Sequence, residues 1–317
     1  MTDDEACARW VDLLDPTPEG LRAALPASIH PKALALLTAP AEHADEPRPL
    51  FRAEGEYVLG IFLVPVLVEA EDRIFYQQID LVLWDGAAVT VRKTPPDLGH
   101  GDSPFAVDEI AAAIAADHAG SAGMIGYHVV DEVAERFLDL ADCAQAEIDE
   151  LEDSVETTSG EDIRTRLSDL RHDLLHIRRV LAPTRDAIRS VIDNRVELES
   201  SDGAAVELFP RDVELHFADA FDKLLRAADA IELCRDLLGG VRDYHQSKVS
   251  MDQNEVMKRL TVVASLLLLP TLIVGVYGQN FDVMPELHWH YGYAFSWLLI
   301  VLTTIGQLWF FRRKRWF

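Results

Sequence analysis

Two long stretches without a charged residue lie near the C-terminal end of the chain, at residues 260–278 and 291–311. Each can cross the hydrocarbon core of a bilayer as an α-helix, because about 20 apolar residues suffice. A core helix of a water-soluble protein seldom extends so far without a charge. Pro270 lies in the first stretch, and membrane helices tolerate proline where neighbouring groups satisfy the freed carbonyl. We therefore predict two transmembrane helices, at about 260–278 and 291–311.

The charges that flank these stretches predict their orientation. Lys and Arg residues precede the first stretch and follow the second, whereas the loop 279–290 contains neither. By the positive-inside rule, both termini are then cytoplasmic. The opening MTDDEACARW is acidic and lacks an apolar stretch, so we expect no secretory signal peptide. We expect a multi-pass protein of the plasma (inner) membrane.

The charge is divided unevenly along the chain. The formal net charge is -25, and the part from Lys258 onward carries +4, so residues 1–257 carry -29. So acidic a domain is a poor partner for nucleic acid. Cys7, Cys143 and Cys234 are isolated, which argues against a disulfide framework or a cysteine zinc site. We expect an α+β cytoplasmic domain with long helices, followed by the two transmembrane helices at 258–317.

The N-terminal part, residues 1–128, is predicted to be a cytoplasmic α/β domain. Its first 50 residues are rich in Ala and Pro and contain one short helix, at 31–37. From Tyr57 onward, apolar residues alternate in segments separated by Asp85-Gly86 and by Thr94-Pro95-Pro96, a pattern typical of strands. We expect a small sheet covered by a helix at 106–119.

Residues 129–257 are predicted to be a helical and stalk region. Helices are expected at about 129–158 and 161–194, and a third from 211 through the Gly239-Gly240 pair to 278. This third helix would measure about 100 Å at 1.5 Å per residue. Its apolar residues recur three and four positions apart, which predicts one packed face. The residues of that face are Phe217, Phe221, Leu224, Ala228, Ile231, Leu238 and Val241.

The C-terminal third resembles the end of CorA-type magnesium transporters. The resemblance rests on NEVMKRLTVVASLLLLPTLIVGVYGQNFDVMPELHWHYGY, on the terminal FFRRKRWF, and upstream on HIRRVLAPTRDAIRS and HFADAFDKLLRAADAIELCRDLLGG. It extends over about 130–317. The resemblance implies a homopentamer in which the long helices form a funnel. It also implies that the first transmembrane helix lines a pore and the second packs outside it.

The pore mouth is expected at Gly278, Gln279 and Asn280. These residues are similar to the family signature Tyr-Gly-Met-Asn, with Gln279 in place of Met. Taken alone, a Gly-x-Asn after an apolar helix is an ordinary C-cap. Mg²⁺ gives up its waters reluctantly and prefers octahedral oxygen ligands, so neutral amide oxygens can hold the hydrated ion. The resemblance therefore implies a selectivity filter in which each subunit supplies Asn280.

The resemblance also implies which residues line the pore below this mouth. They are Asn254, Met257, Leu260, Leu268 and Thr271. For the three apolar ones, contact with lipid or another helix is the alternative. Asp282 and Glu286 in the outer loop would concentrate cations, although an ordinary solvated loop has the same composition.

Candidate metal sites outside the pore are few. Asp219 aligns with a family aspartate of a regulatory divalent-cation site, and a solvated helix face is the alternative. His172 and His176 have a spacing that can bind zinc, but a salt-bridged surface is the favoured interpretation. The run GSAGMIG at 120–126 lacks phosphate-loop chemistry and is interpreted as a turn.

The sequence thus predicts a channel or transporter for divalent cations, Mg²⁺ above all, that is driven by the electrochemical gradient and closed by cytosolic divalent ions. We expect no enzyme activity, because we find no catalytic constellation or ATP site, and no organic cofactor. Two alternatives remain open. One is a zinc, cobalt or nickel transporter of the ZntB type, and the other is a membrane-anchored sensor that does not conduct.

Overall fold

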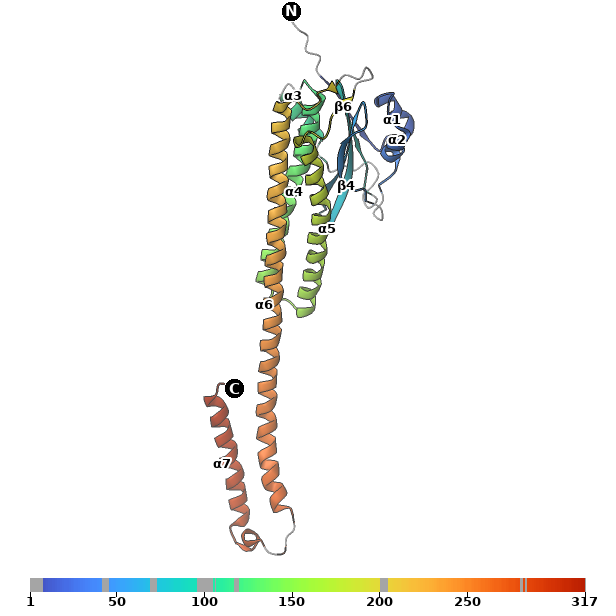
Figure 1. The fold of residues 1–317 in the computed structure, drawn as a ribbon. Coiled ribbons are helices and arrows are strands. Elements are labelled where there is room, and N and C mark those ends of the chain that lie inside the picture. The colour runs from blue at the N-terminus through green and yellow to red at the C-terminus, as the bar shows by residue number, and fades with distance from the viewer. Residues whose placement is uncertain are drawn as a thin grey trace, which may run out of the picture. The chain divides into compact units, whose positions relative to one another are not determined.

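The computed structural model describes residues 8–41, 46–68, 73–95, 105, 107–116, 120–199, 205–279, 282 and 284–316. Its elements appear along the chain in Figure 1. They are β1 (Arg9–Leu14), α1 (Pro18–Ala24), α2 (Pro31–Thr38), β2 (Leu50–Ala53), β3 (Val58–Val68), β4 (Arg73–Trp84), β5 (Ala87–Arg92), α3 (Val107–Ala116), α4 (Ala122–Ser154), α5 (Gly160–Ile192), β6 (Leu198–Glu199), β7 (Ala205–Val206), α6 (Arg211–Tyr277), η2 (Pro285–His288) and α7 (Gly292–Arg313).

Five strands form one sheet in the order β1-β5-β4-β3-β2. The pairs β2–β3, β3–β4 and β4–β5 are antiparallel, whereas β1 is parallel to β5. The β4–β5 connection is a tight turn at Asp85-Gly86, where Gly86 has φ 74°. Glycine adopts this left-handed conformation without a Cβ penalty. The predicted turn is therefore confirmed.

The alternation along β3 divides the core between the two faces of the sheet. Leu59 and Ile61 face one cluster, together with Leu21 from α1 and Leu37 from α2. Val58, Phe62 and Val64 face the larger cluster on the other side. Because successive side chains of a strand point to opposite faces, a central strand that is apolar at nearly every position must be covered on both.

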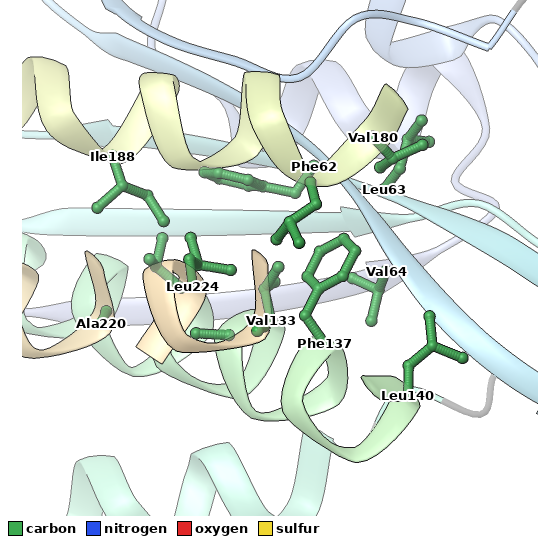
Figure 2. Packing of buried hydrophobic residues seen from close by; sticks show 14 of the residues in the cluster. Phe62, Leu63, Val64, Val133, Phe137, Leu140, Val180, Ile188, Ala220 and Leu224 are labelled. Carbon is green, nitrogen blue, oxygen red and sulfur yellow. The ribbon is translucent and has the colours of Figure 1, made fainter. Parts of the chain in front are cut away.

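The larger cluster joins the sheet to the three long helices. Figure 2 shows Phe62 and Val64 of β3 pointing toward Val133 and Phe137 of α4, with residues of α5 and α6 closing the cluster. The α6 residues in this cluster include Phe217, Leu224, Ile231, Leu238 and Val241, with Phe221 and Ala228 partly buried against it. The packed face predicted from the three-and-four spacing is confirmed.

The chain divides into two compact units, at Val241 and Arg242. The first contains the sheet, α1 to α5 and the beginning of α6, and the second contains the remainder of α6, η2 and α7. Helix α6 continues without interruption through Gly239 and Gly240, as the sequence predicted. The domain boundaries predicted at 128 and 257 stay predictions.

The N-terminal region contains more regular structure than its sequence indicated. In addition to the predicted helix, α2, it forms β1 and α1, and β1 completes the sheet by pairing with β5. The helix predicted at 106–119 exists as α3, but it packs against α4. The expectation that it covers the sheet stays a prediction.

The interpretation of GSAGMIG as a turn was wrong, because α4 begins at Ala122. Ser121 caps this helix by accepting a hydrogen bond from the N–H of Met124 at 3.2 Å. The glycines in this run allow close packing. A Cβ on Gly123 would lie 2.2 Å from the carbonyl oxygen of Leu208, and one on Gly126 would lie 2.6 Å from a methyl carbon of Leu83. Both glycines are there because a neighbour occupies the space of a side chain.

Candidate functional site

The candidate site lies in the second unit, where α6 ends and α7 runs beside it. By length and composition, α6 and α7 each contain a stretch that can cross a membrane. One polar contact joins the two apolar stretches. The side-chain amide of Gln307 on α7 donates to the carbonyl oxygen of Ser265 on α6 at 3.1 Å. Ser265 lies five residues before Pro270. Because Pro270 has no N–H, the carbonyl of Leu266, next to Ser265, lacks its usual partner within the helix.

The five residues predicted to line a pore are all exposed in the single chain. Met257, Leu260 and Leu268 have 57%, 59% and 74% of their surface accessible. Asn254 and Thr271 are exposed as well. At about 100° per residue, the five side chains fall within an arc of about 120° around α6. The structure therefore brings these residues to one face of the helix.

The opposite side of α6 contains the residues covered within the chain. Val262 and Ile273 are the buried residues of this apolar stretch, and Ser265, which contacts Gln307, lies between them and the predicted pore-lining arc. The mean direction of Val262 and Ile273 is about 150° from the centre of the exposed arc. The predicted pore-lining face thus lies within the wider surface of α6 that α7 leaves uncovered, which also includes Val263, Leu272 and Val274.

The two polar residues of this face have their donors engaged in the helix. The amide nitrogen of Asn254 donates to the carbonyl of Ser250 at 2.9 Å, and the hydroxyl of Thr271 donates to the carbonyl of Leu267 at 2.7 Å. Each side chain is left with an oxygen that can accept a hydrogen bond. Such oxygens can receive hydrogen bonds from the waters that surround a hydrated cation.

At the predicted filter, α6 ends at Tyr277 and the next residues turn away from the helix. The N–H of Gly278 donates to the carbonyl of Val274 at 3.0 Å, and the N–H of Gln279 donates to that of Val276 at 3.3 Å. The side chain of Gln279 is exposed. Asn280, the residue on which the filter prediction depends most, lies outside the described residues.

The loop between the two helices contains the two predicted acidic residues. Asp282 is exposed, and Glu286 is half-buried in η2. The carbonyl oxygen of Glu286 accepts a hydrogen bond from the N–H of Trp289 at 3.3 Å. A Cβ added to Gly292 would lie only 2.0 Å from the same oxygen. This close approach fixes η2 against the first residue of α7.

The other metal candidates, Asp219, His172 and His176, belong to the first unit. Asp219 is exposed on the part of α6 in the first unit. His176 pairs with Glu46 at 2.8 Å and contacts the ring of Tyr76, whereas His172 bonds to the carbonyl of Ser168. No group of three or more His, Cys, Asp or Glu side chains able to hold a metal ion occurs among the residues that the structure describes.

Sequence reasoning overlooked Gln307. Its amide oxygen is buried without a hydrogen-bond partner among the described residues, while its nitrogen contacts α6. The available signal was a glutamine inside a charge-free apolar stretch, because polar side chains in membrane helices mostly face other helices.

Comparison with curated proteins finds metal-ion transporters among the relatives. The chain is 33% identical over 195 residues to the putative metal ion transporter YfjQ of Bacillus subtilis, covering 62% of this chain and 58% of that protein. It is 29% identical over 190 residues to the cobalt/magnesium transport protein CorA of Thermotoga maritima, covering 60% of this chain and 51% of that protein. The matched part thus spans about half to three fifths of these relatives.

Comparison with solved structures and with family models extends over nearly the whole chain. The complete structure of the CorA magnesium transporter from Methanocaldococcus jannaschii matches with a TM-score of 0.76 at 21% identity, covering 97% of this chain and 91% of that one. This likeness establishes the fold: an α/β domain with long helices, followed by two apolar helices. The model of the CorA-like Mg2+ transporter protein family matches residues 5–313, and the chain therefore belongs to that family.

Proposed function

We propose that this chain is the subunit of a membrane pore that conducts divalent cations, Mg²⁺ above all, down their electrochemical gradient. The observation that carries the proposal is the exposed face of α6 with Asn254, Leu268 and Thr271, which lies opposite the buried residues Val262 and Ile273. A face that alternates between apolar residues and polar oxygens, and that the second helix leaves open, suits the wall of a path for ions. Both termini are cytoplasmic in this proposal, and the membrane is the plasma (inner) membrane.

The path requires several copies of the chain, because one helix cannot enclose it. A closed ring of α6 helices would bury the exposed arc and place α7 on the outside. The resemblance to CorA-type transporters implies five copies. The family membership and the uncovered arc support this assembly.

The chemistry along the proposed path suits a hydrated ion. Asn280 and Gln279 would offer neutral amide oxygens at the mouth, and Asp282 and Glu286 would raise the local cation concentration. A negative-inside potential favours influx of a doubly charged ion by about 4.6 kcal/mol per 100 mV, at about 2.3 kcal/mol per charge. That driving force needs no nucleotide.

Ion flux into proteoliposomes tests the proposal. Purified full-length protein is reconstituted under a negative-inside potential, and the uptake of Mg²⁺, Co²⁺, Ni²⁺ and Zn²⁺ is followed with encapsulated dyes. Protein-free vesicles are the control. We expect Mg²⁺ uptake well above that control. The absence of flux of any ion would contradict a pore and would favour a sensor that does not conduct.

One observation favours a second candidate, a transporter of zinc, cobalt or nickel. Gln279 replaces the methionine of the family signature and is exposed beside the end of α6. An additional amide oxygen or nitrogen at the mouth would loosen the preference for magnesium. Faster uptake of Zn²⁺ than of Mg²⁺ in the same vesicles would favour this candidate.

We also propose that cytosolic divalent ions close the pore, with Asp219 among the carboxylates that bind them. Residues 1–257 carry a net charge of -29, so like charges crowd together when copies of this part assemble, and divalent ions would relieve the repulsion. Asp219→Ala should raise the internal Mg²⁺ needed for half-inhibition by roughly several-fold. Unchanged inhibition in patch recordings would remove Asp219 from the gate.

A further inference from the structure

A cavity of about 640 Å³ lies in the second unit between α6 and the C-terminal end of α7. Three basic side chains, one carboxylate, one thioether and one indole line it. They are Lys258, Arg259, Arg315, Glu255, Met251 and Trp316. The cavity lies at the ends of the two charge-free stretches, because 260–278 begins just after Arg259 and 291–311 ends just before Arg312.

The end of α7 is folded so that Arg315 and Trp316 reach this cavity. The N–H of Trp316 donates to the carbonyl of Phe311 at 3.1 Å, and the N–H of Arg315 donates to that of Arg312 at 3.2 Å. These two bonds form a Schellman motif, completed by the stacking of Trp316 on Phe311 at 5.9 Å. The bonds also occupy carbonyls that would otherwise repel an anion at the end of the helix.

Arg315 has an unusual conformation for an arginine. It occupies the left-handed position of the motif, with φ 56°, where glycine is the preferred residue. A glycine would relieve the backbone but would remove a positive charge from the cavity. The presence of arginine therefore favours a role for the charge itself.

The charge of the cavity wall is positive and partly unpaired. Glu255 forms an ion pair with Arg259, one turn away on α6. Lys258 and Arg315 form no ion pair with a carboxylate in the part of the chain that the structure describes. Arg312 and Lys314 lie close to Arg315 in sequence and add to the positive potential of the cavity.

We propose that this cavity binds the phosphate-bearing headgroup of an anionic phospholipid, with Lys258 and Arg315 contacting the phosphate. A lipid fits better than a soluble phosphate because the surface beside the cavity is apolar and aromatic: Trp309 and Phe310 are 62% and 51% exposed on the last turns of α7. Aromatic side chains and basic residues gather at the membrane–water boundary, and basic pockets between membrane helices bind anionic headgroups there. The proposal rests on the membrane placement of α6 and α7, and is independent of the ion conducted.

Native mass spectrometry of the full-length protein tests the proposal. The delipidated protein is mixed in mild detergent with phosphatidylglycerol or with phosphatidylcholine at equal ratios. We expect selective retention of phosphatidylglycerol, reduced roughly five-fold in Lys258→Gln and again in Arg315→Gly, since a basic residue near an anionic surface contributes about that factor. The matched control is Arg313→Gln, which removes the same charge from a residue placed over the Trp309 ring at 5.3 Å. Equal loss in Arg313→Gln would overturn the proposal.

Three further measurements keep the result interpretable. Arg315→Gly relieves the left-handed position, so its thermal stability should be kept or raised while lipid is lost, which separates binding from folding. Glu255→Gln removes the carboxylate from the cavity and should increase retention. Displacement of the lipid by millimolar inorganic phosphate would instead identify a site for soluble phosphate and contradict the lipid. Ion flux need not change in any arm, so failure here leaves the proposed pore untouched.

Discussion

At the scale of single residues, Gln279 offers the sharpest test of the proposed pore mouth. Its side chain is exposed beyond the end of α6, so an apolar thioether there should not disturb the packing. We expect Gln279→Met to keep flux and to shift selectivity toward Mg²⁺. The measurement is the ratio of Mg²⁺ to Zn²⁺ uptake in proteoliposomes.

The companion variant Asn280→Ala changes the residue expected to supply the filter oxygens. It should abolish most flux, because an alanine offers no side-chain oxygen to the ion's waters. Normal conduction by Asn280→Ala would show that the filter lies elsewhere. Loss of flux in Gln279→Met would mean that the loop depends on the amide of Gln279.

A buried ion pair in the first unit provides a residue-scale prediction about stability. Lys93 lies 3.0 Å from Asp80, and the side chain of Gln78 donates to Asp80 at 2.7 Å. Burial raises the pKa of the Asp80 carboxyl, so its charge depends on Lys93. Asp80→Asn leaves the ammonium of Lys93 without its counter-ion and should cost about 3–5 kcal/mol.

The double variant Asp80→Asn/Lys93→Met is the control for this pair. It removes both charges together and should recover much of the stability, because a neutral pair needs no counter-ion. Thermal unfolding of the full-length protein in detergent, followed by tryptophan fluorescence, measures both. Equal destabilisation of the single and double variants would show that the charge interaction is not what Asp80 contributes.

At the scale of the elements, the adjacent glycines Gly239 and Gly240 of α6 differ from the two glycines inside α4. A Cβ on Gly239 or Gly240 would meet nothing within 4 Å, whereas one on Gly123 would collide with a backbone carbonyl. Alanine is favoured over glycine in a helix by about 0.5–1 kcal/mol. We expect Gly239→Ala and Gly240→Ala to stabilise the chain by about that amount each, as measured by thermal unfolding.

Gly123→Ala is the comparison, and it should be strongly destabilising. If Gly240→Ala were also destabilising, its Cβ would have to meet an atom of another copy in the assembled protein. The same pair of measurements therefore reports on packing within the chain and on packing between chains.

Periodicity explains why most elements could be predicted from the sequence. Strand β3 is a continuous apolar run, β4 alternates roughly, α4 to α6 repeat at three and four residues, and the last two stretches contain no charge. The strand β1 escaped prediction because its assignment depends on pairing with β5, which lies far away in sequence. The start of α4 escaped because glycine usually indicates a turn, and only the neighbours Leu208 and Leu83 reveal why it is needed.

The candidate site could be predicted only in part. The helical repeat alone places Asn254, Met257, Leu260, Leu268 and Thr271 on one face of α6. It cannot tell which face α7 covers, because both sides of that stretch are apolar. The burial of Val262 and Ile273 on the other side of the helix supplies this information. The roles of the filter residues stay predictions.

At the scale of the whole molecule, an exposed apolar stripe on α6 predicts where copies meet. Leu233 and Leu237 are 53% and 37% exposed and lie one turn apart on the same side of the helix. A carboxylate placed in such a contact would be buried without a partner. We expect wild-type protein to be a homopentamer by native mass spectrometry, and Leu237→Glu to lower the ratio of pentamer to monomer by more than about ten-fold.

Leu175→Glu is the matched control for the assembly. Leu175 is 51% exposed on a different helix, α5, so its replacement should leave the pentamer intact. A wild-type protein that is monomeric or dimeric would contradict the assembly. Equal loss of pentamer in both variants would place the contact somewhere other than the stripe.

The unbroken course of α6 has a mechanical consequence. Helix α6 is hydrogen-bonded from Arg211 to Tyr277, and its first part packs against α4 and α5. Such a helix acts as an elastic shaft, because its hydrogen bonds pass a twist from one turn to the next. Glycine restrains the backbone least, and Gly239 and Gly240 lie beside the boundary between the two units. A stiff shaft turns Leu268 and Thr271 about the helix axis, whereas a soft one absorbs the twist before it arrives. In the proposed pore, the stiffness of the helix around these two glycines would therefore set how much rotation reaches the apolar stretch of α6.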